Sequence, residues 1–287
     1  GFIVGFFVLK VLQRVLSDYP NRANIVVYAL AFMVFLSLSP VHLGGVRNIT
    51  ALSIFIYSTI RFLVDKRSIW IIGVLITPFI HFSYIVCAVV VIIIRVVRLN
   101  WRVIYWPVII VCVASMFLDT SSWAGLIGDM GAYVDNESIV DRAESYADVD
   151  TDNEFSKSVT VRILSVQQIV MSIFMILMLL YLKRNWHRFS SSKYTQRLLD
   201  ISMVLLLLGY TLSSFSVVGQ RYLTVAMLMF YLFCLNIYRE NPKQQSLRYY
   251  LLAMPIVNIG NIAWMIYNSS SVVGTDIFFM PLPLLVL

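Results

Sequence analysis

The stretch Ile69–Ile94, IWIIGVLITPFIHFSYIVCAVVVIII, is almost entirely apolar, with a proline and a histidine three residues apart near its middle. Basic residues flank it on both sides, Lys66 and Arg67 before it and Arg95 after it. Basic residues favour the cytoplasmic side of a membrane. A single crossing would put the two clusters on opposite sides, whereas two crossings with a turn near Pro78–Ser83 put both inside. The charges therefore predict two crossings.

The rest of the chain has the same apolar bias. Of its 287 residues, 60% are hydrophobic and 13% charged, whereas about a quarter are charged in soluble domains. Apolar stretches long enough to cross a bilayer recur throughout. We expect an all-α, polytopic transmembrane helical bundle that forms one membrane domain over residues 1–287, and an N-terminal part missing upstream of Gly1. The predicted spans, about ten, are residues 1–9, 24–41, 48–64, 69–80, 82–97, 102–118, 160–182, 199–217, 222–238 and 249–267.

Two loops of opposite charge set the orientation. The segment from Asp119 to Glu154 holds ten of the fifteen acidic residues, and the segment from Lys183 to Arg197 is basic. The acidic loop should face outward and the basic loop inward. With two crossings of the opening stretch, seventeen of the 22 Lys and Arg residues lie inside. We therefore expect one large extracytoplasmic acidic loop over residues 119–159.

The turn in the opening stretch places His81 below the outer surface. Its two halves, Ile69–Ile80 and Phe82–Ile94, have 12 and 13 residues, about 18–20 Å each as helices, whereas the hydrocarbon core is about 30 Å thick. Irregular backbone at that depth is tolerated only inside protein or beside water. A recessed histidine there either binds or reacts with a ligand, or is a buried residue of one kinked helix. Its position alone favours neither interpretation.

Five basic residues are left outside, and three of them, all arginines, do not belong to the acidic loop or its edge. Arg47, Arg162 and Arg221 each lie at the outer end of a predicted span. Guanidinium groups stay charged and match phosphate oxygens in a bidentate way. Taken singly, each is explained as a helix anchor that reaches toward lipid headgroups. Taken together with His81, they predict a site for an anionic ligand.

Neither a metal nor a cofactor is expected from the sequence. Cys87, Cys112 and Cys234 lie in apolar segments, where they are expected as core residues without metal spacing or a disulfide framework. Phosphate loops, zinc signatures and nucleophile elbows do not occur in the sequence. The net charge of +7 is explained by membrane sidedness, so no nucleic-acid partner is expected.

The stretch GGVRNITALSIFIYSTIRFLVDKRSIWIIGVLITPFIHFSYIV, residues 44–86, resembles the EpsG family of bacterial membrane proteins, the Wzy-type polysaccharide polymerases. That family shows an arginine that opens a helix, a basic inner loop and a His–x–Ser motif. The matching residues are Arg47, Asp65–Arg67 and His81–Ser83. The later run Gln220-Arg221-Tyr222 resembles the family's C-terminal arginine segment, whereas Arg162 and the acidic loop match no family motif.

The resemblance implies a GT-C-like glycosyltransferase. It would join oligosaccharide repeat units carried on undecaprenyl diphosphate at the outer face of the bacterial inner membrane. Its partners would be the lipid-linked oligosaccharide, membrane lipid, and a chain-length regulator and flippase of the same pathway. With the charge pattern, it implies that His81, Arg47 and Arg221 are catalytic. The expected substrate-binding residues are Arg162, Ser83, Gln220 and Tyr222.

Other functions remain open at this level. A membrane O-acyltransferase acting on surface glycans also has many helices with Arg and His in the membrane, but it needs access to cytoplasmic acyl-CoA, and the unusual residues here face outward. A ligase would share the donor chemistry with a different acceptor. A transporter or lipid-linked oligosaccharide flippase would predict internal repeats and ionisable residues along a pathway, and the sequence shows no clear repeat.

Overall fold

The computed structural model describes residues 2–17, 24–37, 46–63, 65–97, 101–117, 159–189, 191–212, 216–258 and 260. In these ranges the chain is all-helical, as predicted, and no strand occurs. Most of the predicted acidic loop lies outside them. The α-helices are α1 (Phe2–Ser17), α2 (Ile25–Ser37), α3 (Val46–Leu63), α4 (Ile71–Ile80), α5 (Tyr84–Val96), α6 (Trp101–Phe117), α9 (Val159–Asn185), α10 (Lys193–Thr211), α11 (Ser216–Glu240) and α12 (Gln245–Val257).

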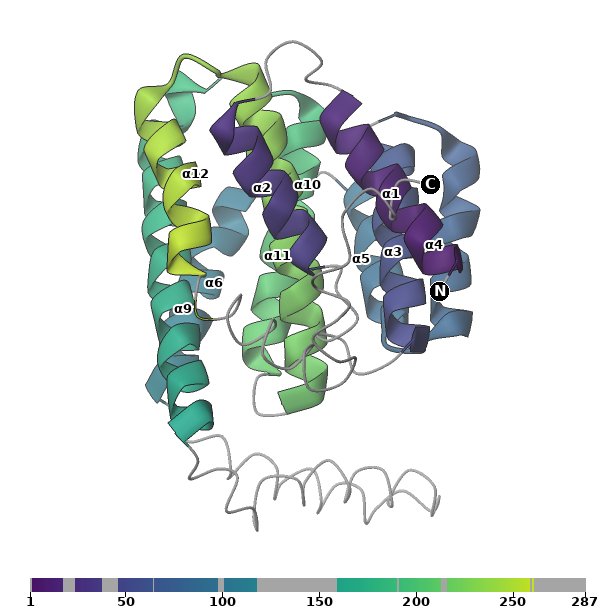
Figure 1. The fold of residues 1–287 in the computed structure, drawn as a ribbon, viewed down its shortest axis with the longest axis horizontal. Coiled ribbons are helices and arrows are strands. Elements are labelled where there is room, and N and C mark those ends of the chain that lie inside the picture. The colour runs from purple at the N-terminus through teal and green to yellow at the C-terminus, as the bar shows by residue number, and fades with distance from the viewer. Residues whose placement is uncertain are drawn as a thin grey trace, which may run out of the picture.

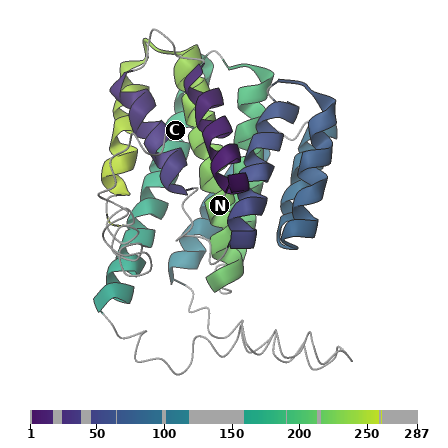
Figure 2. The ribbon, with the colours of Figure 1, turned by 45° about the vertical axis from the view of Figure 1, so that its right-hand side comes forward.

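The helices lie side by side and alternate in direction (Figure 1). The antiparallel pair α10 and α11 forms the centre, with α6 packed on α10 and α2 packed on α11. Helices α1, α3, α4 and α5 form one flank, where α3 contacts both α1 and α4. Helices α9 and α12 form the other flank, and the turned view in Figure 2 separates them from the first. The arrangement places the starts of α3 and α11 at the same end of the bundle.

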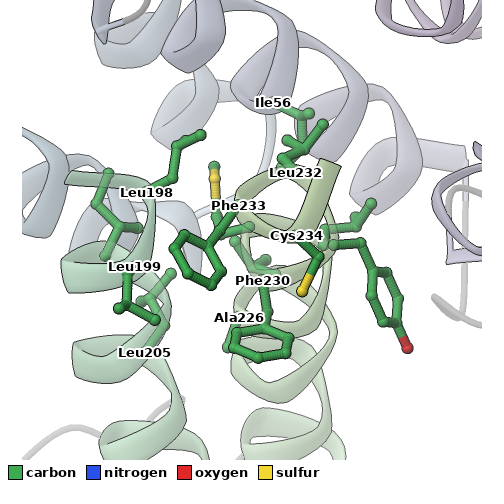
Figure 3. Close-up of a cluster of buried hydrophobic side chains, with 14 of the residues drawn as sticks. Ile56, Leu198, Leu199, Leu205, Ala226, Phe230, Leu232, Phe233 and Cys234 are labelled. Carbon is green, nitrogen blue, oxygen red and sulfur yellow. The ribbon is translucent and has the colours of Figure 1, made fainter. Parts of the chain in front are cut away.

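The central pair is held by a dense apolar core and by close backbone approach. A Cβ atom on Gly209 of α10 would lie 2.7 Å from the Leu223 side chain of α11 and 3.0 Å from its backbone nitrogen. The Ser202 hydroxyl donates a hydrogen bond of 3.0 Å to the Ala226 carbonyl. Small residues and interhelical hydrogen bonds are the usual means of helix association in membranes. Figure 3 shows the buried cluster, with Ile56, Leu198, Leu199, Leu205, Ala226, Phe230, Leu232, Phe233 and Cys234 labelled.

Basic residues gather at one end of the bundle, called here the basic end. They occupy the last turns of α1, α3, α5, α9 and α11, where cations also complement the helix dipole. These residues are Arg14, Arg61, Arg95, Lys183, Arg184 and Arg239. The end of α6 and the start of α9, which the acidic segment joins, lie at the opposite end (Figure 1). The described helix ends therefore gather the basic residues at one end, whereas the acidic residues of the predicted loop lie outside the described ranges.

At the basic end one carboxylate ties α1 to α3. Asp65 accepts hydrogen bonds from Arg14 at 2.7 Å and from Arg61 at 2.5 Å. Burial of the carboxyl raises the pKa of Asp65, but the hydrogen bonds and charges of Arg14 and Arg61 outweigh this, so its pKa is lowered overall. Two of the arginines at this end thus share one counter-ion within the protein.

The opening stretch folds as two short helices, α4 and α5, joined by a turn at residues 81–83. The predicted helix pair with a turn near Pro78–Ser83 is therefore present, whereas its two membrane crossings stay a prediction. Pro78 lies inside α4, where it leaves the Val74 carbonyl without its usual N–H donor. The Thr77 hydroxyl donates to that carbonyl at 2.7 Å instead. The helix ends only at His81, whose backbone is extended, with φ −150° and ψ 115°.

Two stretches of the described chain are long and apolar enough to cross a membrane alone, Ile169–Arg188 with 20 residues and Gly219–Glu240 with 22. Shorter apolar helices cover Ile25–Phe35, Ser68–Ile80, Tyr84–Val96 and Arg102–Ser115. The number of spans and the GT-C-like architecture thus stay predictions. The three cysteines are buried, as expected.

Candidate functional site

The turn after α4 holds the His81 ring through Ser83. The Ser83 hydroxyl lies 2.8 Å from Nδ1 of His81, and the Ser83 backbone N–H points at the same nitrogen from 3.4 Å. A peptide N–H is only a donor, so this geometry favours the tautomer in which Nδ1 accepts and Nε2 carries the proton. Within the described part of the chain, Nε2 has no hydrogen-bond partner. The ring can therefore donate one hydrogen bond to a ligand.

Two aromatic rings fix the plane of His81. Phe82 stacks on it with centroids 5.4 Å apart, and Tyr84 meets it edge-on at 6.1 Å. The Tyr84 hydroxyl donates to the Asn48 carbonyl of α3 at 3.4 Å. Because Asn48 follows Arg47, this bond ties the histidine turn to the helix start that carries the arginine. Sequence reasoning overlooked Tyr84, although its place three residues after the histidine, in the first turn of α5, is a signal for such a contact.

Two arginines from distant parts of the sequence act on this histidine. Arg47 lies exposed in the first turn of α3, and Arg221 lies half-buried in the second turn of α11. The positive charges of both reach the His81 ring. The three residues predicted to be catalytic thus lie at the same end of the bundle (Figure 1).

Neither Arg47 nor Arg221 has a hydrogen bond or an ion pair within the ranges the structure describes. The basic end is different: Asp65 pairs with two arginines there, and Lys183 lies over Trp106, 4.2 Å from the ring centroid. The starts of α3 and α5, which carry partial positive charge, also face the site. Two cations without a counter-ion beside two helix starts suit a multiply charged anion.

The other predicted substrate-binding residues lie at different places. Ser83 is buried, with 6% of its surface exposed, and contacts His81. Tyr222 is also buried, at 6%, whereas Gln220 is exposed. Arg162 lies in the first turn of α9, at the same end of the bundle, and its side chain is outside the described set.

The described residues include no group of three or more His, Cys, Asp or Glu that could hold a metal ion.

A family model matches residues 1–281, which is nearly the whole chain, and it is that of the EpsG family. The chain belongs to the EpsG family. The resemblance seen in the sequence is thereby confirmed. This EpsG protein is a membrane protein of polysaccharide biosynthesis, and the family implies a polymerase-like function. No curated protein and no solved structure shows a significant match to it.

Proposed function

We propose that this EpsG protein is a Wzy-type polymerase, a glycosyltransferase that joins oligosaccharide repeat units carried on undecaprenyl diphosphate. The observation that carries the proposal is the pair Arg47 and Arg221, which have no counter-ion in the described structure and which lie at the starts of α3 and α11, at the same end of the bundle as His81 (Figure 1). A lipid diphosphate is a multiply charged anion anchored at a membrane surface. It is the kind of ligand that such a pair would neutralise.

The proposed reaction transfers a growing glycan from one lipid diphosphate to a hydroxyl of the next repeat unit. The bond between the sugar C1 and the diphosphate oxygen breaks, a new bond forms between C1 and the acceptor oxygen, and the acceptor hydroxyl loses its proton. Negative charge grows on the leaving diphosphate. Arg47 and Arg221 would stabilise it, and preorganised charges of this kind lower a barrier by a few kcal/mol each.

In this proposal His81 donates its Nε2–H to a diphosphate oxygen. The role follows from the tautomer that Ser83 favours, because an Nε2 that carries a proton cannot also accept one. The acceptor proton would then leave to another group, which the described residues do not identify. Because α4 and α5 are short, this donor would lie below the level of the membrane surface, where hydrogen bonds to charged groups are stronger.

The setting of the proposal is the outer face of the bacterial inner membrane. The segregation of basic residues to the other end of the bundle supports this orientation. The protein would form a GT-C-like bundle of about ten spans. It would work beside a flippase that delivers repeat units and a regulator of chain length, with no nucleic acid involved.

A polymerase-deficient strain that supplies the matching repeat unit tests the proposal in cells. The full-length gene is expressed as wild type, His81→Ala, His81→Gln and His187→Ala, the last being an exposed histidine near the basic end that serves as matched control. Wild type and His187→Ala should give a ladder of chain lengths, and His81→Ala a single repeat. His81→Gln, which keeps an N–H donor, should give a weak ladder. Single repeats with the wild type would overturn the polymerase, and a full ladder with His81→Ala would remove His81 from the site.

A further inference from the structure

Two phenylalanines beside the candidate site project away from the bundle. Phe79 is 90% exposed, the highest value among the large hydrophobic side chains that the structure describes, and Phe82 is 60% exposed. One face of Phe82 stacks on His81, which leaves its other face outward. These two rings, called here the aromatic shelf, therefore lie between the histidine and the surroundings of the bundle.

The shelf continues into an apolar strip along α4 and α5. Ile72 and Ile76 of α4 are 55% and 46% exposed, and Ile85 of α5 is 52% exposed. Positions 72, 76 and 79 recur at helical spacing, so they share one face of α4. The opposite face, with Val74 and Thr77, is buried. In a membrane the strip contacts lipid chains from the level of His81 toward the basic end.

We propose that the polyprenyl chain of the lipid diphosphate leaves the site over Phe79 and Phe82 and lies along this strip. The inference rests on the proposed function, since it takes a diphosphate at Arg47 and Arg221 as its starting point. A diphosphate held at His81 is below the membrane surface, so the first isoprene units of its chain must pass the groups that separate His81 from lipid. Phe82 is such a group, because it touches the ring and is itself exposed.

The shelf would set the path of the chain more than its affinity. Bulk lipid tails are as apolar as a polyprenyl chain. Contact of that chain with Phe79 and Phe82 therefore gains free energy from van der Waals packing alone. Flat isoprene units with methyl branches suit aromatic faces. Most of the binding free energy would come from the diphosphate, and the tether would hold the chain at the shelf at a high effective concentration.

Photo-crosslinking tests the path independently of catalysis. Benzoylphenylalanine replaces Phe79, Phe82 or Phe35 in the full-length protein, in nanodiscs of phosphatidylethanolamine and phosphatidylglycerol with radiolabelled undecaprenyl diphosphate. Phe35 of α2 is the matched control, being 50% exposed on another helix. Cross-linking at positions 79 and 82 should be saturable and fall at least fivefold with excess unlabelled lipid. At position 35 it should be weak and not saturable. Cross-linking at positions 79 and 82 should also fall in a protein that carries both Arg47→Ala and Arg221→Ala.

The outcomes separate the inference from the proposed function. Cross-linking at position 79 that is no more saturable than at position 35 would reduce the shelf to ordinary bilayer contact and overturn the inference. Saturable cross-linking that survives the double arginine variant would keep the path and overturn the role of the arginines. A second readout needs no bulky group: Phe79→Ala should weaken binding of undecaprenyl diphosphate about threefold and leave binding of inorganic diphosphate, which has no chain, unchanged. Equal effects of Phe79→Ala and Phe35→Ala would contradict it.

Discussion

At the scale of single residues, His81 is oriented by its own turn. Ser83, two residues along the chain, contacts Nδ1, and the rings of Phe82 and Tyr84 contact the imidazole from two directions. The identity of His81 and Ser83 could be predicted from the sequence because their motif is local. Which ring nitrogen faces the ligand could not, since that depends on the backbone of the turn.

Ser83→Ala removes the hydroxyl that lies 2.8 Å from Nδ1. We expect kcat for polymerisation to fall about tenfold with little change in KM, because the donor is misplaced mainly in the transition state. Ser83→Thr, which keeps a hydroxyl, should retain most of the wild-type kcat. Kinetics with purified protein and lipid-linked repeat units measure this. A higher KM with kcat unchanged would instead support the substrate-binding role first predicted for Ser83.

Asp65→Asn should destabilise the protein through the basic end. The carboxylate binds Arg14 and Arg61, and a partly buried network of this kind contributes about 1–2 kcal/mol. Because the folded-state pKa of Asp65 lies below its usual 3.8, the contribution is fully present above that pH and is lost as the pH falls through the folded value. Thermal unfolding in detergent should show a lower Tm for Asp65→Asn at pH 7.

The control for this measurement is Arg67→Gln, an exposed change in the same loop, which should leave the Tm unchanged. The difference between wild type and Asp65→Asn should shrink as the pH is lowered through 4. A difference that is constant from pH 7 to pH 3 would show that the ionised carboxylate contributes nothing.

At the scale of elements, the helix pair α4 and α5 could be predicted because charge clusters flank it on both sides. The turn was also predicted near Pro78–Ser83 and lies at residues 81–83, but how α4 continues past Pro78 could not be predicted. A proline removes one hydrogen bond, and the local chain here supplies a substitute through Thr77. Helix α4 therefore continues past Pro78 and ends where the backbone of His81 becomes extended.

Thr77→Val should cost about 1–2 kcal/mol, since the buried Val74 carbonyl loses its donor. In a Pro78→Ala background the same change should cost much less, because the alanine restores a backbone N–H at that position, and this N–H then bonds the carbonyl. Unfolding of the four proteins in detergent gives the coupling between the two sites as a double-mutant cycle. Equal costs in both backgrounds would show that the Thr77 hydroxyl does not replace the missing N–H.

Helix starts were less predictable than helix cores. The span predicted over 199–217 corresponds to α10, which begins at Lys193. The Ser192 hydroxyl caps it by accepting from the Thr195 N–H at 3.3 Å, and the Thr195 hydroxyl donates to Glu240 at 3.0 Å. Polar caps of this kind extend a helix beyond its apolar part, so hydropathy alone places the start too late.

At the scale of the whole molecule, the gathering of basic residues at one end could be predicted because it depends only on the alternation of spans and loops. The assembly of the site is less evident from the sequence. Arg47 and Arg221 are far apart along the chain, and nothing in their spacing places both beside His81. The antiparallel order of α3, α4, α5 and α11 puts the starts of α3 and α11 and the turn between α4 and α5 at the same end of the bundle (Figure 1).

Cysteine labelling should reveal the orientation of the bundle. Ser192→Cys and Gln220→Cys each introduce a thiol at an exposed position, the first before α10 and the second near the start of α11. The native cysteines are buried, so background reaction should be low. An impermeant maleimide added to intact spheroplasts should label position 220 and not position 192, and lysis should expose both. The reverse pattern would contradict the charge-based orientation.

The measurement that tests the central claim most directly is kcat/KM for polymerisation by purified Arg47→Ala, Arg221→Ala and the double variant, with exposed Arg67→Ala as control. Each site variant should lose about 10²–10³-fold, the usual effect of removing one charge-stabilising donor. The double variant should lose less than the product of the single losses, because the two arginines act on one diphosphate. Arg67→Ala should match the wild type. Values for Arg47→Ala and Arg221→Ala within threefold of that control would contradict an anion site built by these two arginines.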